Sequence, residues 1–74
     1  MPQINFDKIS FGKHVWQYRR KMGYSIRDLK SVTGVSIGTI SKIENQLILP
    51  DVETLGTLCH CLDLDIREYF NFIV

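Results

Sequence analysis

Two cysteines and a histidine lie side by side near the C-terminal end of the chain, and these residue types can bind zinc or act as nucleophiles. The triplet is Cys59, His60 and Cys61, whereas the second histidine, His14, lies far upstream. A structural zinc site takes about four ligands. On a helix, residues two apart point about 200° apart, so the two thiols are badly placed to share a metal or a disulfide. We therefore expect reduced thiols packed as small apolar residues, and no metal site.

Enzymatic chemistry would need further groups around these thiols. A cysteine nucleophile requires a nearby acid–base pair, and phosphate chemistry requires a glycine-rich loop. The sequence has neither pattern, and 74 residues leave little space for a pocket. We expect no catalytic activity and no cofactor.

Charge is divided unevenly along the chain. Residues 1–43 hold eight cations and two acids, a net charge of +6, whereas residues 44–74 hold one cation and six acids, a net charge of −5. Such asymmetry is typical of a protein that turns a basic face toward a polyanion. Charge alone leaves open the alternative of two solvated faces without a partner.

Length and composition predict one small globular domain, because 45% of the residues are hydrophobic and 23% are charged. A core of this size is marginal, so we expect local helical order or dimerisation to support it. No apolar run approaches the roughly 18 residues that span a bilayer, and no signal-peptide pattern is present. We expect a cytoplasmic protein without a membrane partner.

Apolar spacing predicts an all-α protein, a compact bundle of about five short helices. The apolar stripes of the first four helices are Phe11, Val15 and Tyr18; Ile26, Leu29 and Val32; Ile37, Ile40 and Ile43; and Val52, Leu55, Leu58 and Leu62. A fifth helix leads into the aromatic residues Tyr69 and Phe70. Ile4 and Phe6 alternate with polar residues, but this pattern is too short to assign a strand.

Helix boundaries follow from capping residues and glycines. Ser25 with Asp28 forms a capping box, Ser36 and Asp51 are candidate N-caps, and Gly34 stands where a turn needs a positive φ. The second and third helices are therefore joined by a tight turn, as in a helix-turn-helix.

The residues of this motif carry a family resemblance. They are Gly23-Tyr24-Ser25-Ile26-Arg27-Asp28-Leu29, then Thr33-Gly34-Val35-Ser36, then Thr39-Ile40-Ser41-Lys42-Ile43-Glu44-Asn45. This string resembles the Cro/C1-type (XRE-like) DNA-binding family, with its lambda-repressor-like fold. The resemblance implies a domain over 11–70 with its motif at about 25–45, an N-terminal arm at 1–10 and an apolar C-terminal tail at 71–74.

By this resemblance, the helix at about 36–45 is the recognition helix and enters the major groove of double-stranded DNA. The residues then expected to face DNA bases are Ser36, Ile37, Gly38, Thr39 and Lys42, and those expected at the phosphate backbone are Ser25, Ile26, Arg27 and Asn45. Ile37 and Gly38 replace the Gln, Arg or Ser that is frequent in the family, which weakens hydrogen bonding to bases. The alternative for Ile37 is core packing.

Further departures lie close to the motif. Ile26 stands where glutamine is frequent, Gln46 replaces the usual glycine after the recognition helix, and Lys30 replaces a small residue. The helix ending at Gln46 is therefore expected to differ, and Lys30 must extend its charge to solvent or shift the helix pair.

The resemblance also implies a structural ion pair between Arg19 of the first helix and Glu44 of the recognition helix. Such a pair would tie the recognition helix to the scaffold. The alternative is an exposed pair that contributes little.

The chain closes on an apolar run in which we expect a homodimer interface, formed by Phe70, Phe72, Ile73 and Val74. The alternative is that this run completes a small core.

Together these features predict a sequence-specific DNA-binding transcriptional regulator, expected to act as a repressor and homodimer, with a regulatory protein as a further possible partner. The alternative is an antitoxin or adaptor that uses the same fold mainly for protein–protein interaction. Ile37 and Gly38 offer no side-chain hydrogen bonds to DNA bases, and this keeps the alternative open.

Overall fold

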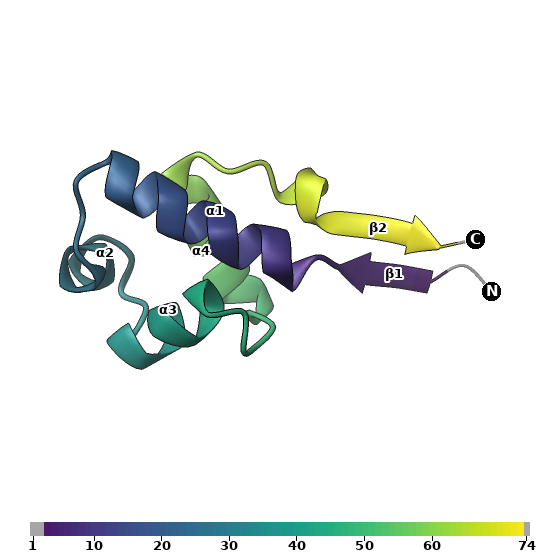
Figure 1. The fold of residues 1–74 in the computed structure, drawn as a ribbon, viewed down its shortest axis with the longest axis horizontal. Helices are drawn as coiled ribbons and strands as arrows, with labels where there is room; N and C mark the ends of the chain where they lie inside the picture. Colours follow the sequence, from purple (N-terminus) through teal and green to yellow (C-terminus); the bar gives the residue numbers. More distant parts are fainter. Residues whose placement is uncertain (1–2, 74) are drawn as a thin grey trace.

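In the part of the chain that the structure describes, four α-helices and one 3-10 helix form the body, and two short strands from opposite ends of the chain pair into a sheet (Figure 1). The structure is a computed structural model that describes the backbone of residues 3–73 and the side chains of residues 4–71. The elements are β1 (Gln3–Phe6), α1 (Lys8–Lys21), α2 (Ile26–Thr33), α3 (Ile37–Glu44), α4 (Val52–Leu62), η1 (Ile66–Tyr69) and β2 (Phe70–Ile73). In Figure 1, α2 lies at one end of the body and the sheet extends from the other.

The N-caps predicted from sequence are confirmed. The Ser25 hydroxyl accepts a hydrogen bond from the Asp28 amide at 3.0 Å, and the Asp28 carboxylate accepts one from the Ser25 amide at 2.9 Å. The Asp51 carboxylate accepts a bond from the Thr54 amide at 2.7 Å. These backbone donors lower the pKa of Asp28 and of Asp51, because they stabilise the ionised carboxylate.

The core is a single apolar cluster to which every helix contributes. Its buried members are Phe11, Val15, Leu29, Ile40, Ile43, Leu55, Leu58, Cys59, Leu62 and Tyr69. Tyr69 is 1% exposed, and its ring lies edge-on to that of Phe11 at 5.1 Å. The Tyr69 hydroxyl is 2.7 Å from Nδ1 of His14, so the one polar atom of this ring has a partner.

The apolar stripes predicted from spacing are correct at their centres and wrong at several ends. Tyr18 is 36% exposed, and Arg19 takes its place beside Val15 on the buried face of α1. Val32 is 49% exposed and Val52 is 86% exposed. Val32 and Val52 lie at or next to the ends of α2 and α4, and Tyr18 lies in the last turn of α1.

The all-α prediction is incorrect at the two ends of the chain, because β1 and β2 pair antiparallel, with Phe6 opposite Phe70 and Ile4 opposite Phe72. The number of helices also differs, since four are α-helices and η1 is a single 3-10 turn. The strands lie in segments that the sequence assigned to an arm and a tail. They are four residues long and far apart in sequence, so no local period reveals their pairing.

The cysteines do not form a disulfide. Cys59 is buried in the core, and burial raises the pKa of its thiol, while Cys61 is half-buried. Among the side chains that the structure describes, no group of three His, Cys, Asp or Glu residues is close enough to hold a metal ion.

Candidate nucleic-acid interface

Helix α3 separates into a buried face and an exposed face. Ile40 and Ile43 are 0% and 1% exposed and face the core, whereas Ile37 is 38% exposed and Lys42 is also exposed. Ser36 and Gly38 are exposed, and Thr39 is half-buried beside them. The five residues predicted to face bases therefore lie together at and after the N-terminus of α3, away from the core.

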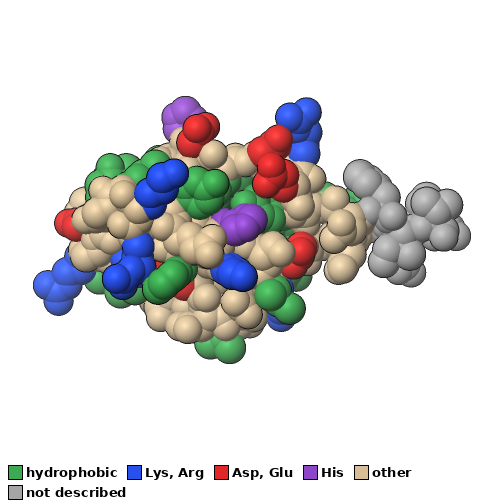
Figure 2. Space-filling model, turned by 45° about the horizontal axis from the view of Figure 1, so that its top comes forward, with side chains coloured by type: hydrophobic (Ala, Val, Ile, Leu, Met, Phe, Trp, Pro, Cys, Tyr) green, Lys and Arg blue, Asp and Glu red, His purple; other side chains and the backbone are tan. Residues whose placement is uncertain are grey.

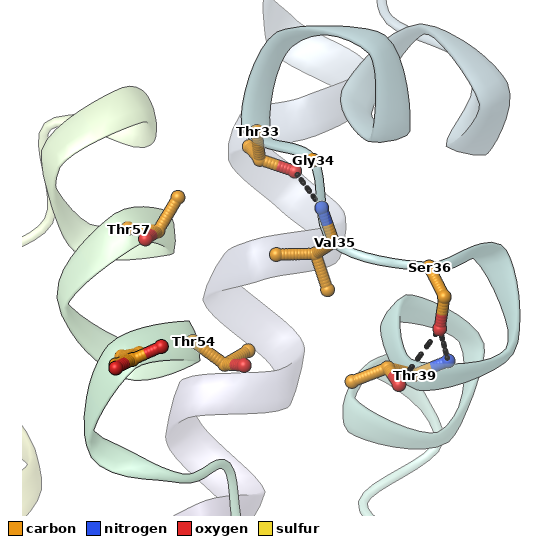
Figure 3. A pocket seen from close by; sticks show the side chains of 8 residues that line it. Thr33, Gly34, Val35, Ser36, Thr39, Thr54 and Thr57 are labelled. Atoms are coloured by element: carbon orange, nitrogen blue, oxygen red, sulfur yellow. Dashed lines mark hydrogen bonds between the residues drawn. The ribbon is translucent and has the colours of Figure 1, made fainter.

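Two of these residues also shape the start of the helix. The Ser36 hydroxyl accepts a hydrogen bond from the Thr39 amide at 3.2 Å and donates to the Thr39 hydroxyl oxygen at 2.9 Å, as drawn in Figure 3. The Ser36 proton is thus directed at Thr39, while the Thr39 hydroxyl keeps its own proton. Thr39 and Lys42 are the better hydrogen-bond donors of this surface.

Asn45 ends α3 and is exposed, but its amide nitrogen is directed back at its own helix. Nδ2 donates to the Ser41 carbonyl oxygen at 2.9 Å. Nδ2 also lies 3.4 Å from the Ser41 hydroxyl oxygen, a longer contact. Because the amide nitrogen has two N–H donors, Asn45 needs to give up only this longer contact in order to donate to a phosphate.

The other three residues predicted at the phosphate backbone lie at the opposite end of the motif, where α2 begins. Ser25 and Arg27 are exposed, whereas Ile26 is half-buried against the core. The first amides of a helix have no partner within it, so this end favours anions. Next to it, a hollow of about 480 Å³ is lined by Arg19, Arg20, Gly23, Tyr24, Ser25 and Ile26.

The turn between α2 and α3 is built by Thr33 and Gly34. The Thr33 hydroxyl donates to the Leu29 carbonyl oxygen at 2.7 Å and accepts from the Val35 amide at 3.1 Å. Gly34 has a φ of 77°, the left-handed conformation predicted for it. A cleft of about 290 Å³ lies between this turn and α4; it is lined largely by hydroxyl groups, with Thr54 and Thr57 on its α4 side (Figure 3).

An ion pair holds α3 against α1. Arg19 Nε donates to Glu44 Oε2 at 2.7 Å and Arg19 Nη2 donates to Glu44 Oε1 at 3.0 Å. Arg19 Nη1 donates to the Tyr24 carbonyl oxygen at 2.8 Å. The pair is largely buried, with side chains 9% and 6% exposed.

Gly12 and Tyr24, to which sequence reasoning gave no structural role, also support α3. A Cβ atom at Gly12 would overlap the Ile43 carbonyl oxygen, so α1 and α3 approach closely there. A glycine inside an apolar helical pattern was the available signal. The Tyr24 carbonyl oxygen accepts a hydrogen bond from Arg19, and its half-buried side chain packs against the core. The His14–Tyr69 bond joins α1 to η1 across 55 residues, so it had no local signal.

Gln46 follows α3 with a φ of 63°, although it is not glycine. The Gln46 amide donates to the Ile43 carbonyl oxygen at 3.0 Å, and the Leu47 amide donates to that of Lys42 at 2.8 Å. The left-handed conformation that closes this helix is therefore kept despite the side chain.

The predicted dimer residues lie in β2 and beyond it. Phe70 is half-buried, and its ring is 5.2 Å from that of Phe6. Phe72 and Ile73 contribute backbone to β2, but their side chains are outside the described set, and Val74 is outside the described residues.

Charged side chains gather by sign on the face shown in Figure 2. In this view most Lys and Arg side chains lie toward the left and lower parts, although one lies at the upper right, whereas Asp and Glu side chains are more frequent along the top and right and one lies at the left edge. The uneven distribution of charge along the sequence therefore corresponds to an uneven distribution of charge on this face.

The family model named helix-turn-helix (HTH_3) matches residues 17–69. A similar solved structure is the clp gene regulator ClgR from Corynebacterium glutamicum, with 23% identity, a TM-score of 0.72, and coverage of 86% of this chain and 68% of that one. Another is the restriction-modification controller protein C.AhdI from Aeromonas hydrophila, with 22% identity, a TM-score of 0.72, and coverage of 84% and 94% respectively.

At this level of identity the two structures establish a shared fold. No curated protein sequence matches the chain. Within its described part, no helix is both long and apolar enough to cross a membrane.

Proposed function

Because the chain belongs to the helix-turn-helix family of the Cro/C1 type, we propose that it is a transcriptional regulator that binds double-stranded DNA. The observation that carries this proposal is the exposed N-terminal half of α3, which is held rigidly by the buried Arg19–Glu44 pair. A recognition helix must be presented by rigid elements if its side chains are to meet base edges in register. The names of the two similar solved structures, both regulators, agree with this role.

We propose that recognition combines a few donors with apolar contact. Thr39 and Lys42 offer hydrogen bonds to bases or phosphates, and Ile37 offers apolar contact to a thymine methyl group. Gly38 has no side chain, and a Cβ built there would meet nothing within 4 Å of it in the protein. With so few donors, the sequence-dependent shape of the duplex is expected to contribute to specificity.

Phosphate contacts would fix the register of the domain on the duplex. Arg27 and the amides at the start of α2 are one group, with Ser25 as its cap and Ile26 contributing apolar packing in place of a side-chain bond. Asn45 is a second contact once its amide gives up the longer contact with the Ser41 hydroxyl.

We further propose a cytoplasmic homodimer that acts as a repressor on inverted half-sites. Centres one helical turn apart, about 34–36 Å, suit two copies of a single motif. A repressor needs only to occupy its operator, a role that DNA binding by a single small domain can fill.

Selection of binding sites from random duplex DNA tests the proposal directly. The purified protein should enrich a common half-site as an inverted pair, and mobility shifts should give a log–log dependence on salt with a negative slope. An unenriched pool with no shifted complex at low salt would overturn the proposed function.

A second function is favoured by one specific observation, the exposed apolar residues in the loop after α3 and at the first residue of α4. Leu47, Leu49 and Val52 are 67%, 61% and 86% exposed. Exposed apolar groups of this size suit a protein partner, as in an antitoxin or adaptor. Failure of the DNA selection with a correctly folded protein would favour this alternative.

A further inference from the structure

An exposed tryptophan on α1 has no place in the core. Trp16, the only tryptophan of the chain, is 45% exposed and belongs neither to the buried cluster nor to the residues packed against it. Its ring instead lies beside a cation one turn further along the helix, since the guanidinium carbon of Arg20 is 5.1 Å from the ring centroid. A guanidinium at this distance is attracted to the face of the ring. The two side chains therefore form one unit, the Trp16–Arg20 stack.

The charge of Arg20 is not neutralised by a carboxylate in the described part of the chain. The side chains described there form two ion pairs, Arg19–Glu44 and Arg67–Asp65, and Arg20 is in neither. Stacking occupies the face of the planar guanidinium and leaves the N–H donors at its edge free. Donors in this fork arrangement match the oxygens of a phosphate group.

The stack lies on the flank of α1 next to the end of α3. Trp16 is four residues after Gly12 and three before Arg19, and residues at these spacings are neighbours on a helix surface. Gly12 and Arg19 both approach the last turn of α3. Trp16 therefore lies close to the place where α3 ends and Asn45 is exposed.

Arg20 also borders the start of α2. It lines the hollow of about 480 Å³ whose wall includes Ser25 and Ile26. None of the six residues that line this hollow carries a carboxylate, and the second cation among them, Arg19, is neutralised by Glu44. Arg20 is therefore the cation of this wall that is free to bind an anion.

We propose that Arg20, held in place by Trp16, binds a phosphate of the DNA backbone between the phosphates contacted by Asn45 and by the start of α2. Arg20 contacts the ligand, and Trp16 is a positioning residue that acts through Arg20. Stacking restricts the flexible arginine side chain in advance, so less conformational entropy is lost on binding. The inference rests on the proposed function and adds to it a backbone contact from α1, outside the helix-turn-helix motif.

Lys21 offers a matched comparison on another flank of α1, since neighbouring residues of a helix point about 100° apart. Its ammonium nitrogen is 5.7 Å from the centroid of the Tyr18 ring, so it is also an exposed cation beside an aromatic ring. Lys21 does not line the hollow. Lys21→Ala therefore removes the same charge as Arg20→Ala without removing the proposed contact.

Ethylation interference on the duplex obtained by selection tests the contact at single phosphates. Ethylation of a contacted phosphate removes its charge and weakens binding by the original protein. For Arg20→Ala, one of these phosphates in each half-site should lose its effect while the others keep theirs. The log–log salt slope of Arg20→Ala should also be smaller by about one unit for each bound copy. Lys21→Ala should keep the slope and the full set of phosphates.

A double-variant cycle tests the positioning role of Trp16. Trp16→Leu should weaken binding by about two- to five-fold, as expected for loss of an exposed cation–π pair. In the Arg20→Ala background the same change should have no effect, because the side chain that Trp16 positions is gone. A loss through unfolding would weaken binding in both backgrounds, and urea unfolding of each variant measures it separately.

Three results would overturn the inference. If Arg20→Ala keeps every phosphate that the original protein contacts, Arg20 is outside the interface. Equal changes of slope for Arg20→Ala and Lys21→Ala would reduce its role to net charge, and equal effects of Trp16→Leu in both backgrounds would remove the positioning role. In all three cases the original protein still binds and the proposed function stands. If the original protein binds no duplex, the proposed function fails and this inference fails with it.

Discussion

Arg19 and Glu44 form a two-pronged ion pair between the end of α1 and the end of α3, with nitrogen–oxygen distances of 2.7 and 3.0 Å. The third donor of the guanidinium reaches the Tyr24 carbonyl at 2.8 Å. One side chain therefore connects α1, the segment before α2, and α3. Because these partners all lie within the protein, the Arg19 side chain fixes the position of α3 relative to α1.

We expect Glu44→Ala to lower the free energy of unfolding by up to about 3–5 kcal/mol, because it leaves a buried guanidinium without its counter-charge. Glu44→Ala combined with Arg19→Met should recover much of this loss. Urea unfolding followed by circular dichroism measures both. Arg67→Ala is the control: its pair with Asp65 is exposed to solvent, so the change should leave the free energy of unfolding almost unchanged. Strictly additive losses in the double variant would show that the two residues are uncoupled.

Gly12 marks the closest approach of α1 to α3, and we expect Gly12→Ala to destabilise the fold. The added methyl group would overlap the Ile43 carbonyl oxygen, which is backbone and can move only with the helix. Overpacking of this kind typically costs about 1–3 kcal/mol. Gly56→Ala in α4 meets nothing within 4 Å and should stabilise by about 0.5–1 kcal/mol. Thermal unfolding of the two variants should shift in opposite directions; equal shifts would contradict the close approach.

The parts of the fold that could be predicted from sequence are those fixed within a few residues. The Ser25–Asp28 box and the left-handed Gly34 follow from local hydrogen bonding and backbone sterics, and both are present. The pairing of Phe6 with Phe70 joins opposite ends of the chain. The spacing of apolar residues within one short segment carries no information about a contact with the other end of the chain. The sheet could therefore not be predicted.

The first helix shows a second limit. Hydrophobic spacing assigns Tyr18 to the buried face, yet Arg19 is the residue that is buried there, at 8% exposure. A charged residue can be buried when its partner is also buried, and the pattern of apolar residues carries no information about pairing. Only the family resemblance indicated Arg19.

Because the Tyr69 hydroxyl is buried, we expect the protein to lose stability in alkaline solution. Burial, as the largest cause, raises its pKa to about 12, above the ordinary value of about 10. The stability that the neutral Tyr69 hydroxyl contributes is therefore complete below pH 10 and is lost as the pH rises toward 12. Each pKa unit between the unfolded and folded values corresponds to about 1.4 kcal/mol of the free energy of unfolding. Tyr69→Phe should remove this part of the pH dependence, as measured by urea midpoints between pH 8 and pH 11. Identical slopes for the two proteins would refute it.

Two isoleucines on opposite faces of α3 test its orientation. Ile40 is 0% exposed, so Ile40→Ala should cost about 2–5 kcal/mol of stability. Ile37 is 38% exposed, so Ile37→Ala should leave stability within about 1 kcal/mol of the original and weaken binding to the selected duplex. Unfolding and mobility-shift measurements on both variants separate the effects. A large stability loss from Ile37→Ala would place this residue in the core.

Lys42 gives the most direct test of the proposed DNA surface, because it is exposed on α3 one turn beyond Gly38 and Thr39. Lys42→Ala should weaken DNA binding and leave the unfolding transition unchanged. If the ammonium group contacts a phosphate, the log–log salt slope should shrink by about one unit; if it reads guanine, discrimination at one base position should fall by about 1–3 kcal/mol.

Arg67→Ala removes an equal charge from η1, outside the helix-turn-helix motif, and is the matched control for this variant. Its salt slope and its base preference should stay those of the original protein, since a cation outside the interface releases no counterion from the duplex. Loss of binding by both variants to the same extent would reduce the role of Lys42 to net charge. Unchanged affinity and unchanged specificity for Lys42→Ala would remove it from the interface, and with it the proposed direction in which α3 faces the groove.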